Sequence, residues 1–508
     1  MPKKPNSPDF VVGIIGAGAM GRGIAQIMAT GGLEVLLYDT NDEAAAAGRD
    51  FADRMIFRAC EKGLMSEEEA KGAVERLAVA GKLSDLAVAD LVIEAVIEDL
   101  DVKRQVFLSL EECVTKDCVL VTNTSSLSVT AIAAVMKYPG RFAGFHFFNP
   151  VPLMKIVEVV NGLETNEETC EILVRISRRV GHEPVRAKDT PGFLVNHAGR
   201  GLNTEGVRIV SEGITNFSGV DDLLREGGPN FRMGPFELMD TTGLDVSHPV
   251  MESIYQQFYG EPRFRPNPLT LQRSVAGLHG RKTGRGFYTY KNNKKMQNLE
   301  EGAPEVMPES IWISKAEPEG YDVLLGALRE VIEIDKGQKP STRSLCLFTP
   351  TGSDVTSAAT TEGVEAERSF GVDTLFGLDG RRTLMSTPVS DPDLRDLVHA
   401  ALAADGHTVT VIHDSPGFVN QRVVATIVNI ACDIAQQRIA SPSDIDKAVT
   451  LGLGYPMGPL SMGDNVGAKR VLKILNAMCD FYGDPRYRAS PWLKRRALLG
   501  VSLLTMEN

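Results

Sequence analysis

Two residues that can transfer a proton and stabilise the resulting charge, His146 and Glu158, lie at equal sequence distances from Pro152. The apolar runs at 142–147 and 154–160 predict two buried strands, because the proline-rich stretch between them disfavours both helix and sheet. If the chain reverses there, the two side chains become cross-strand neighbours, and the carboxylate can orient the imidazole and increase its basicity. His146 would then be a general base. The alternative is a core histidine bonded to a backbone carbonyl, with Glu158 on a solvated strand face.

A glycine motif stands at the first turn of the chain. Residues 10–15 predict a short buried strand that leads directly into Gly16, Gly18 and Gly21 and then into a helical pattern. In this context the glycines permit a tight turn, close approach of a pyrophosphate and packing of helix on strand, while the helix N-terminus attracts negative charge. Asp39 ends the next apolar run, where it can accept a hydrogen bond from a ribose 2′-hydroxyl and would repel a 2′-phosphate. The motif therefore predicts NAD binding; a purely structural turn is the alternative.

Polar residues also follow two later predicted strands. Ser125 comes after the apolar run 118–122, at the carboxyl end of a strand, where doubly wound sheets bind ligands. It is a candidate donor to a ligand, or else the N-cap of the short helix that follows. Glu98 and Lys103 lie near the boundary between the loop after another strand and the next predicted helix.

Helices are predicted between the strands of the first part of the chain and throughout the part that follows. Residues 41–60 and 66–79 predict two helices that leave the sheet, and a capping box at Ser66 opens the second. From residue 189 the pattern becomes all-helical, with helices expected at 192–212, 220–226 and 234–258. We expect a Rossmann-type doubly wound α/β domain at 1–188, an all-α domain at 189–290 and a linker at 291–320.

The last part of the chain repeats the helical domain. The motif at 189–193 recurs at 414–418, and the motif at 233–240 recurs at 457–464, so the two copies stay nearly in register. We expect the second copy of the helical domain to span 414–508.

A degenerate α/β domain is expected before the second copy, at 321–413. This stretch shows strand and helix signals but no glycine motif and nothing like the sequence around His146. Gln421 stands where the first copy has Asn196, which indicates one working site per chain.

Composition excludes several classes of function. The 508-residue chain has a net charge of −12 at pH 7, which argues against a nucleic-acid surface. No apolar run approaches the roughly 20 residues of a membrane span, and residues 1–9 lack the apolar core of a signal peptide. The seven cysteines form no C-x-x-C pair, which predicts no metal site, no disulfide framework and a cytoplasmic location. They are Cys60, Cys113, Cys118, Cys170, Cys346, Cys432 and Cys479.

Five ordered motifs give the chain a resemblance to a known family. They are GAGAMG (16–21), NTSS (123–126), HFFNP (146–150), DTPGF (189–193) and MGPFEL (233–238). Together they resemble the L-3-hydroxyacyl-CoA dehydrogenase family over residues 10–290. The long form with a second helical copy is similar to the bacterial members of phenylacetate breakdown, which act on 3-hydroxyadipyl-CoA, and to related 3-hydroxybutyryl-CoA enzymes.

The resemblance implies a role for each matching residue. His146 matches the catalytic base, Glu158 its carboxylate partner, and Ser125 the serine at the junction of substrate and nicotinamide. Asn149 and Asn196 match asparagines that contact cofactor and substrate. Family contacts to NAD match Asp39, Glu98, Lys103 and Lys282. Lys62 fits a contact to coenzyme A, while Met55 stands where the family can offer a serine to it.

Several alternatives and extensions stay open from sequence. A dehydrogenase of a hydroxy acid without coenzyme A would be expected to use a lysine base, and a non-catalytic NAD-binding protein would lack turnover. Arg200, Arg208 and Arg232 are candidates to meet a far carboxylate of a dicarboxylic substrate only by their location in the helical domain.

The assembly is expected to be a monomer or a homo-oligomer. In shorter family members the helical domain forms the dimer interface, and the second copy could occupy that surface from within the chain. Deletion from about residue 311 is then predicted to expose apolar surface and cause dimerisation or aggregation.

Overall fold

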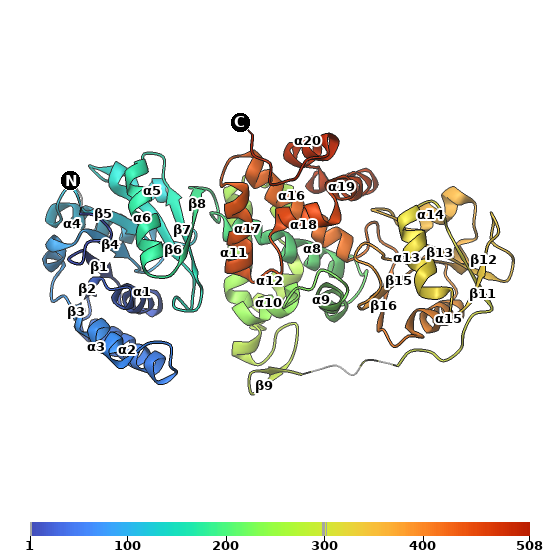
Figure 1. Cartoon of the computed structure of the whole chain (residues 1–508), viewed down its shortest axis with the longest axis horizontal. Helices are drawn as coiled ribbons and strands as arrows, with labels where there is room; N and C mark the ends of the chain where they lie inside the picture. The colour runs from blue at the N-terminus through green and yellow to red at the C-terminus, as the bar shows by residue number, and fades with distance from the viewer. Residues whose placement is uncertain (1–2, 297–299, 301, 508) are drawn as a thin grey trace. The chain divides into compact units, whose positions relative to one another are not determined.

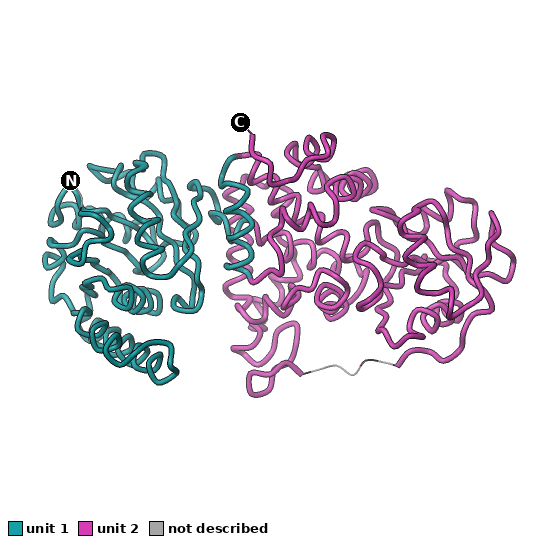
Figure 2. Tube along the Cα trace, in the orientation of Figure 1, with its two compact units in different colours: residues 1–197, 438–453 teal, residues 198–437, 454–508 magenta. Residues whose placement is uncertain are grey.

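The computed structural model describes residues 3–296, 300 and 302–507. The chain forms two compact units, one of residues 1–197 and 438–453 and the other of residues 198–437 and 454–508 (Figure 2). No helix among the described residues is long and apolar enough to cross a lipid bilayer.

The first unit is built on an eight-stranded sheet in the order β3-β2-β1-β4-β5-β6-β7-β8. Every neighbouring pair is parallel apart from the antiparallel pair of β6 and β7. The strands are β1 (Val11–Ile15), β2 (Glu34–Tyr38), β3 (Leu77–Val79), β4 (Leu91–Glu94), β5 (Val119–Thr122), β6 (Phe142–Phe147), β7 (Ile156–Asn161) and β8 (Glu183–Lys188). Strands β4, β5 and β6 are fully buried, as expected for a sheet covered on both faces.

Helices cover both faces of this sheet (Figure 1). The helices are α1 (Ala19–Thr30), α2 (Asp42–Glu61), α3 (Glu67–Glu75), α4 (Leu100–Cys113), α5 (Val129–Ala133), α6 (Glu167–Arg179) and α7 (Val195–Ala198). One apolar core joins the sheet to α1 and α6, and a second joins it to α4 and α5. The Rossmann-type doubly wound domain predicted from sequence is confirmed.

The predicted helix at 66–79 is too long. The Ser66–Glu69 capping box is present, but α3 ends at Glu75 and the apolar triplet Leu77–Val79 forms β3 beside β2. The open edge of β2 offers unpaired backbone groups, and satisfying them outweighs a local helical pattern.

The second unit contains most of both helical copies. The helices of the first copy are α8 (Arg200–Ser211), α9 (Phe217–Glu226), α10 (Pro235–Thr242), α11 (Leu244–Gln257) and α12 (Pro268–Val275). Those of the second copy are α16 (Asn420–Gln436), α18 (Pro459–Val466), α19 (Ala468–Tyr482) and α20 (Pro491–Leu499). Helices α8 and α16 pack closely, since a Cβ at Gly201 would lie 3.1 Å from the Cα of Ile427. The predicted helix at 234–258 is divided into α10 and α11 by Gly243, whose φ is +91°.

The second unit also contains a smaller α/β sheet in the order β12-β11-β13-β14-β15-β16. Its strands are β11 (Ser310–Ile313), β12 (Glu333–Asp335), β13 (Ser344–Phe348), β14 (Ser369–Val372), β15 (Arg382–Ser386) and β16 (Val409–His413). Its helices are α13 (Pro318–Leu328), α14 (Val355–Glu362) and α15 (Pro392–Ala403), and a hairpin of β9 (Tyr290–Lys291) and β10 (Lys294–Lys295) precedes it. The antiparallel pair β14–β15 matches β6–β7, which confirms a reduced α/β segment.

One helix of the second copy belongs to the first unit. Helix α17 (Pro442–Leu453) packs against β7 and β8, and it is the segment coloured with the Rossmann-type sheet in Figure 2. The backbone N–H of Lys188, at the end of β8, donates to the carbonyl of Ile439 over 2.9 Å. The second copy is thus divided between the two units.

Candidate active site

The predicted pairing of His146 with Glu158 is confirmed as a geometry. The register of β6 and β7 places the two residues directly opposite each other, and His146 Nδ1 lies 2.5 Å from Glu158 Oε2. His146 is 5% exposed and Glu158 is 0% exposed. Because Nδ1 is engaged by the carboxylate, Nε2 is the ring nitrogen that can exchange a proton with a ligand.

Glu158 is fixed by backbone as well as by the imidazole. Its Oε1 accepts hydrogen bonds from the N–H groups of Leu194 at 2.9 Å and Val195 at 2.8 Å. Both oxygens of this buried carboxylate are therefore engaged, which fixes the orientation of Glu158 and, through it, of the imidazole.

The motif at 189–193 explains how those two N–H groups are positioned. Asp189 accepts from the Ser128 hydroxyl at 2.7 Å and from the N–H groups of Val129 and Thr130 at 3.1 and 2.7 Å, so its carboxylate ties the loop to α5. Phe193 has a φ of +47°, and its ring centroid lies 5.9 Å from that of His146. The motif is therefore a structural clamp at the start of α7.

A second polar cluster surrounds Glu98. Its Oε1 accepts from the hydroxyl of Thr124 at 2.7 Å and from the N–H groups of Ser125 and Ser126 at 2.9 and 3.0 Å. Burial alone would raise the pKa of Glu98, but these hydrogen bonds and the charge of Lys103 outweigh it, so the pKa is lowered. The cap of α5 is Ser128, not Ser125, and the hydroxyl of Ser125 donates to Glu98 Oε1 over 3.3 Å at the carboxyl end of β5.

Lys103 lies under this cluster. Its Nζ is 2.6 Å from Glu94 Oε1 and 3.4 Å from Glu98 Oε2, and the side chain is 1% exposed. Glu94, which is fully buried at the end of β4, was not among the site residues predicted from the sequence. The only available signal was a charged residue at the end of an apolar strand, where a buried carboxylate requires a partner.

The glycine motif has the shape that a dinucleotide requires. Gly16 has a φ of +97°, and a Cβ there would lie 2.6 Å from the carbonyl oxygen of Ala95. A Cβ at Gly21 would lie 1.7 Å from the Gly16 carbonyl oxygen, whereas a Cβ at Gly18 would meet nothing within 4 Å. Gly18 thus faces open space at the N-terminus of α1, which has no side-chain cap.

Asp39 borders the same space. It lines a cavity of about 570 Å³ together with Gly16, Gly18 and Val96, and its carboxylate accepts from the N–H of Ala17 at 2.8 Å. The residues present fit a bound NAD: glycines at the turn, a free helix N-terminus and a carboxylate at the end of β2.

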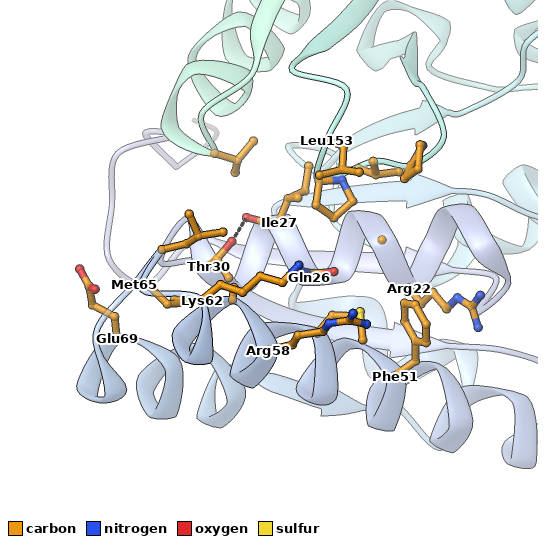
Figure 3. Close-up of a pocket in the computed structure, with 18 of the residues that line it drawn as sticks. Arg22, Gln26, Ile27, Thr30, Phe51, Arg58, Lys62, Met65, Glu69 and Leu153 are labelled. Carbon is orange, nitrogen blue, oxygen red and sulfur yellow. Dashed lines mark hydrogen bonds between the residues drawn. The ribbon is translucent and has the colours of Figure 1, made fainter. Parts of the chain in front are cut away.

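A larger pocket of about 1170 Å³ lies between α1, the α2–α3 hairpin and the segment after β6. Lys62 lines it, as do Met55 and the exposed side chain of Asn149. Figure 3 shows Arg58 and Lys62 along the groove between α1 and α2.

The same pocket contains cations that sequence reasoning did not select. Arg22 stands 3.8 Å over the ring of Phe51, and Arg58 lies one helical turn before Lys62 on α2 (Figure 3). The helical spacing of Arg58 and Lys62 was a usable signal, since residues four apart share a face.

Two further predicted site residues are Asn196 and Lys282. Asn196 is half-buried in α7, next to the Val195 N–H that holds Glu158. Lys282 belongs to the second unit, where its Nζ is 2.5 Å from Asp245.

The candidate arginines for a far carboxylate also lie in the second unit. Arg200 is buried, which lowers its pKa to about 10. Arg208 forms ion pairs with Glu212 and Asp484. Arg232 is exposed.

Comparison with known proteins gives the family. The family described as "3-hydroxyacyl-CoA dehydrogenase, NAD binding domain" matches residues 11–190, and "3-hydroxyacyl-CoA dehydrogenase, C-terminal domain" matches residues 192–290 and 417–502. The chain belongs to the 3-hydroxyacyl-CoA dehydrogenase family. The double match of the C-terminal domain confirms the duplication, and the NAD-binding domain confirms the cofactor.

Relatives of this dehydrogenase include proteins that match it over nearly their whole length and its own. The 3-hydroxyadipyl-CoA dehydrogenase of Escherichia coli (strain K12) is 36% identical over 491 residues, which are 96% of this chain and 97% of that protein. The crystal structure of 3-hydroxybutyryl-CoA dehydrogenase from Escherichia coli K12 substr. MG1655 is similar with a TM-score of 0.85 at 35% identity, covering 97% of this chain and 98% of that one. A probable 3-hydroxybutyryl-CoA dehydrogenase of Bacillus subtilis (strain 168) is 39% identical over 54% of this chain and 96% of its own length.

The smaller α/β sheet of the dehydrogenase has different residues at the corresponding site. Lys188 and His413 end β8 and β16, and the strand registers counted from them place Thr383 at the position of Glu158. One step beyond the β14–β15 register, Asp373 stands at the position of His146. The imidazole–carboxylate pair is therefore replaced in the second sheet.

Proposed function

We propose that this dehydrogenase oxidises an (S)-3-hydroxyacyl-CoA to the 3-oxoacyl-CoA with NAD, and that its substrate is 3-hydroxyadipyl-CoA or 3-hydroxybutyryl-CoA. The observation that carries the reaction type is the buried contact of His146 with Glu158, 2.5 Å apart, on the same sheet as the glycine turn that fits a dinucleotide. The names of the full-length relatives support the substrate class.

His146 is the general base of the proposed reaction. Its Nε2 takes the proton of the substrate 3-hydroxyl, and Glu158, held by Leu194 and Val195, stabilises the imidazolium that forms. NAD, when bound, supplies the hydride acceptor. In the reverse direction the same imidazolium returns the proton, so the carboxylate assists both directions.

Ser125 and Asn196 position the reacting groups. Both lie near the carboxyl ends of strands or the loop that holds Glu158, where a hydroxyl and an amide can bind the substrate oxygens in line. Gly16, Gly18, Gly21, Asp39 and Asn149 are proposed to hold the cofactor, together with Glu98 and Lys103, which also fix the Ser125 loop.

The pocket between α1 and α2 is proposed to hold coenzyme A. Lys62, Arg58 and Arg22 provide cations for its phosphate groups. Replacing Lys62 by alanine is expected to raise KM for the acyl-CoA about tenfold and to leave KM for the acyl-pantetheine thioester, which has no ADP group, unchanged. Lys71→Ala on α3, where Lys71 pairs with Glu67, is the matched control. An equal effect of Lys62→Ala on both thioesters would place coenzyme A elsewhere.

We also propose a cytoplasmic location. All seven cysteines are free thiols, as expected in a reducing compartment. The assembly is proposed as a monomer or a homo-oligomer.

Steady-state NADH formation tests the proposal. 3-Hydroxyadipyl-CoA and 3-hydroxybutyryl-CoA are compared side by side, with NADP in place of NAD and with free 3-hydroxy acids as controls. Preference for the dicarboxylic thioester would assign a role in aromatic-acid breakdown, and preference for the short chain a role in butyrate or fatty-acid metabolism. Turnover of free hydroxy acids alone would indicate a dehydrogenase without coenzyme A, and NADH binding without turnover a non-catalytic protein.

A further inference from the structure

Each α/β sheet makes backbone contacts with the helical copy that belongs to the other half of the chain. In the first unit, Lys188 at the end of β8 donates to Ile439 of the second helical copy over 2.9 Å. In the second unit, His413 at the end of β16 donates to Ile214 of the first helical copy, also over 2.9 Å. Lys188 and His413 are 225 residues apart, and so are Ile214 and Ile439. Each sheet is therefore joined to the helical copy that follows the other sheet.

A second pair of contacts repeats the pattern with the same spacing. In the first unit, Gly452 of α17 abuts Val195, since a Cβ at Gly452 would lie 2.9 and 3.1 Å from the two γ-carbons of Val195. In the second unit, Asn420 donates from Nδ2 to the carbonyl of Gly227 over 3.0 Å. Val195 and Asn420 correspond, as do Gly227 and Gly452, at a spacing of 225 residues. Such reciprocal contacts are the signature of a two-fold interface, here formed within one chain.

The contact of Gly452 leads directly to the buried pair. Val195 is 0% exposed, and its backbone N–H donates to Glu158 over 2.8 Å. The other oxygen of that carboxylate contacts His146. The residues that lie between α17 and the imidazole are thus Val195 and Glu158, both buried.

We propose that Gly452, in the second half of the chain, is a positioning residue for His146 and Glu158. The absence of a side chain lets α17 press against Val195 and fix the N–H group that holds the carboxylate. A Cβ at this position must displace Val195, because Val195 is β-branched, stiff and enclosed. This inference rests on the proposed role of His146 as the base.

The charged residues of α17 do not contact Glu158 among the hydrogen bonds and ion pairs of the described residues. Lys447 of α17 pairs with Glu183 of β8 over 2.6 Å, and the other charged residues of α17 are Asp444 and Asp446, near its start. The groups that face Glu158 are His146 and the N–H groups of Leu194 and Val195. Gly452 therefore acts by shape.

The test compares Gly452→Ala and Gly452→Val in the full-length chain. Alanine favours a helix more than glycine does, so Gly452→Ala does not weaken α17 itself. We expect kcat to fall about tenfold in Gly452→Ala and about 100-fold in Gly452→Val, because small misplacements of a reacting group cost this much. KM for NAD should stay unchanged, and the acid limb of the pH–rate profile should move to lower pH as the imidazolium loses its partner.

Two controls separate positioning from general damage. Leu451→Ala changes an exposed side chain on the same helix and should leave kcat unchanged. Gly227→Ala is the corresponding change at the smaller sheet, where a Cβ would lie 3.0 Å from Asn420 Nδ2, and it should lower stability without moving the pH profile.

A compensating variant keeps the proposal falsifiable if Gly452→Val does not fold. Val195→Ala removes the two γ-carbons that the new Cβ would meet, so the double variant Val195→Ala, Gly452→Ala should turn over at least as fast as Val195→Ala alone. Wild-type kcat and pH profile in Gly452→Ala, or no compensation in the double variant, would overturn the proposal.

A readout without substrate distinguishes this inference from the proposed reaction. The eight histidines can be labelled with ¹³C, and the titration of His146 followed by NMR in the wild type and in Gly452→Ala. If Gly452→Ala shifts the His146 titration but the wild type does not turn over acyl-CoA, the positioning role of Gly452 stands and the proposed reaction is refuted. If the wild type turns over acyl-CoA but Gly452→Ala leaves the titration unchanged, the reaction stands and the positioning role is refuted.

Discussion

The two α/β sheets of this chain share a topology and differ in chemical content. Both place an antiparallel pair of strands before the last strand, and both are followed by the same clamp. In this clamp Asp189 accepts hydrogen bonds from the first turn of α5, and Asp414 accepts them from the first turn of α14. Phe193 and Phe418 even share a φ of +47°. Yet His146 and Glu158 on one sheet correspond to Asp373 and Thr383 on the other. The motif 189–193 is therefore a device of the fold, and the strand residues decide the chemistry.

The buried acids of the two sheets differ in their partners. Glu158 has three donors, whereas Asp373 accepts on Oδ1 from Gln421 and Leu375, and its buried Oδ2 has no hydrogen-bond partner. Burial raises the pKa of Asp373 to about 6, although the hydrogen bond from Gln421 opposes the shift. Both oxygens of Glu158 therefore have hydrogen-bond partners, whereas one oxygen of Asp373 has none.

Replacing His146 by glutamine is expected to lower kcat far more than the corresponding substitution in the second sheet. Loss of the general base should lower kcat by about 10²–10⁴-fold while substrate and NAD still bind. Asp373→Asn at the corresponding position should leave kcat unchanged. Steady-state NADH formation with both variants measures the contrast, and near-full turnover of His146→Gln would remove this residue from the mechanism.

The stability of the smaller sheet should depend on pH through Asp373. Its folded-state pKa, about 6, lies above the ordinary 3.8, so its contribution to stability is present at low pH and is lost as pH rises through about 6. Asp373→Asn removes this loss, which amounts to about 3 kcal/mol at most. Thermal unfolding between pH 4.5 and 7.5 should show Tm of the variant rising relative to the wild type. A constant difference would mean that Asp373 is ionised throughout.

Replacing Glu158 by glutamine tests the carboxylate without removing the acceptor for Leu194 and Val195. Loss of the negative charge should lower kcat about tenfold and move the acid limb of the kcat/KM profile to lower pH. Thr383→Val at the corresponding position of the smaller sheet is the control. An unchanged pH profile in Glu158→Gln would limit Glu158 to a structural role.

The smallest expected effects are those of substitutions in the glycine motif, where Gly18 and Gly16 are compared within the first sheet. Gly18→Ala places a Cβ in open space, so the fold should be unaffected while KM for NAD rises about tenfold. Gly16→Ala places a Cβ 2.6 Å from a carbonyl oxygen at a φ of +97°, so Tm should fall. Measuring Tm and KM for both variants separates the two roles. A lower Tm in Gly18→Ala would mean that this glycine also serves the fold.

Much of the first unit could be predicted from sequence because its signals are local. The turn around Pro152 fixes the register of β6 and β7, and this brings His146 opposite Glu158. The strand β3 was missed because its pairing with β2 depends on residues distant in sequence. The buried Glu94–Lys103 pair was missed because an acidic residue at the end of an apolar run gives no sign of its partner.

The position of helix α17 is the feature that was least predictable from the sequence. Its sequence places it in the second helical copy, and the duplication itself could be recognised from two motifs. Its packing on β7 and β8 follows from the exchange between halves, which leaves no trace in periodicity or composition. Patterns along the chain identify repeats, but they do not tell which repeat packs on which sheet.

The exchanged helices also bear on how such a chain can evolve. After a duplication, a half without chemistry is normally free to decay or to be lost by truncation. Here the half without a counterpart of His146 provides the helix that packs on the sheet of His146, and the other half provides Ile214 in return. Truncation of either half would therefore remove a packing partner of the other, which constrains how a duplicated chain of this kind can lose a domain.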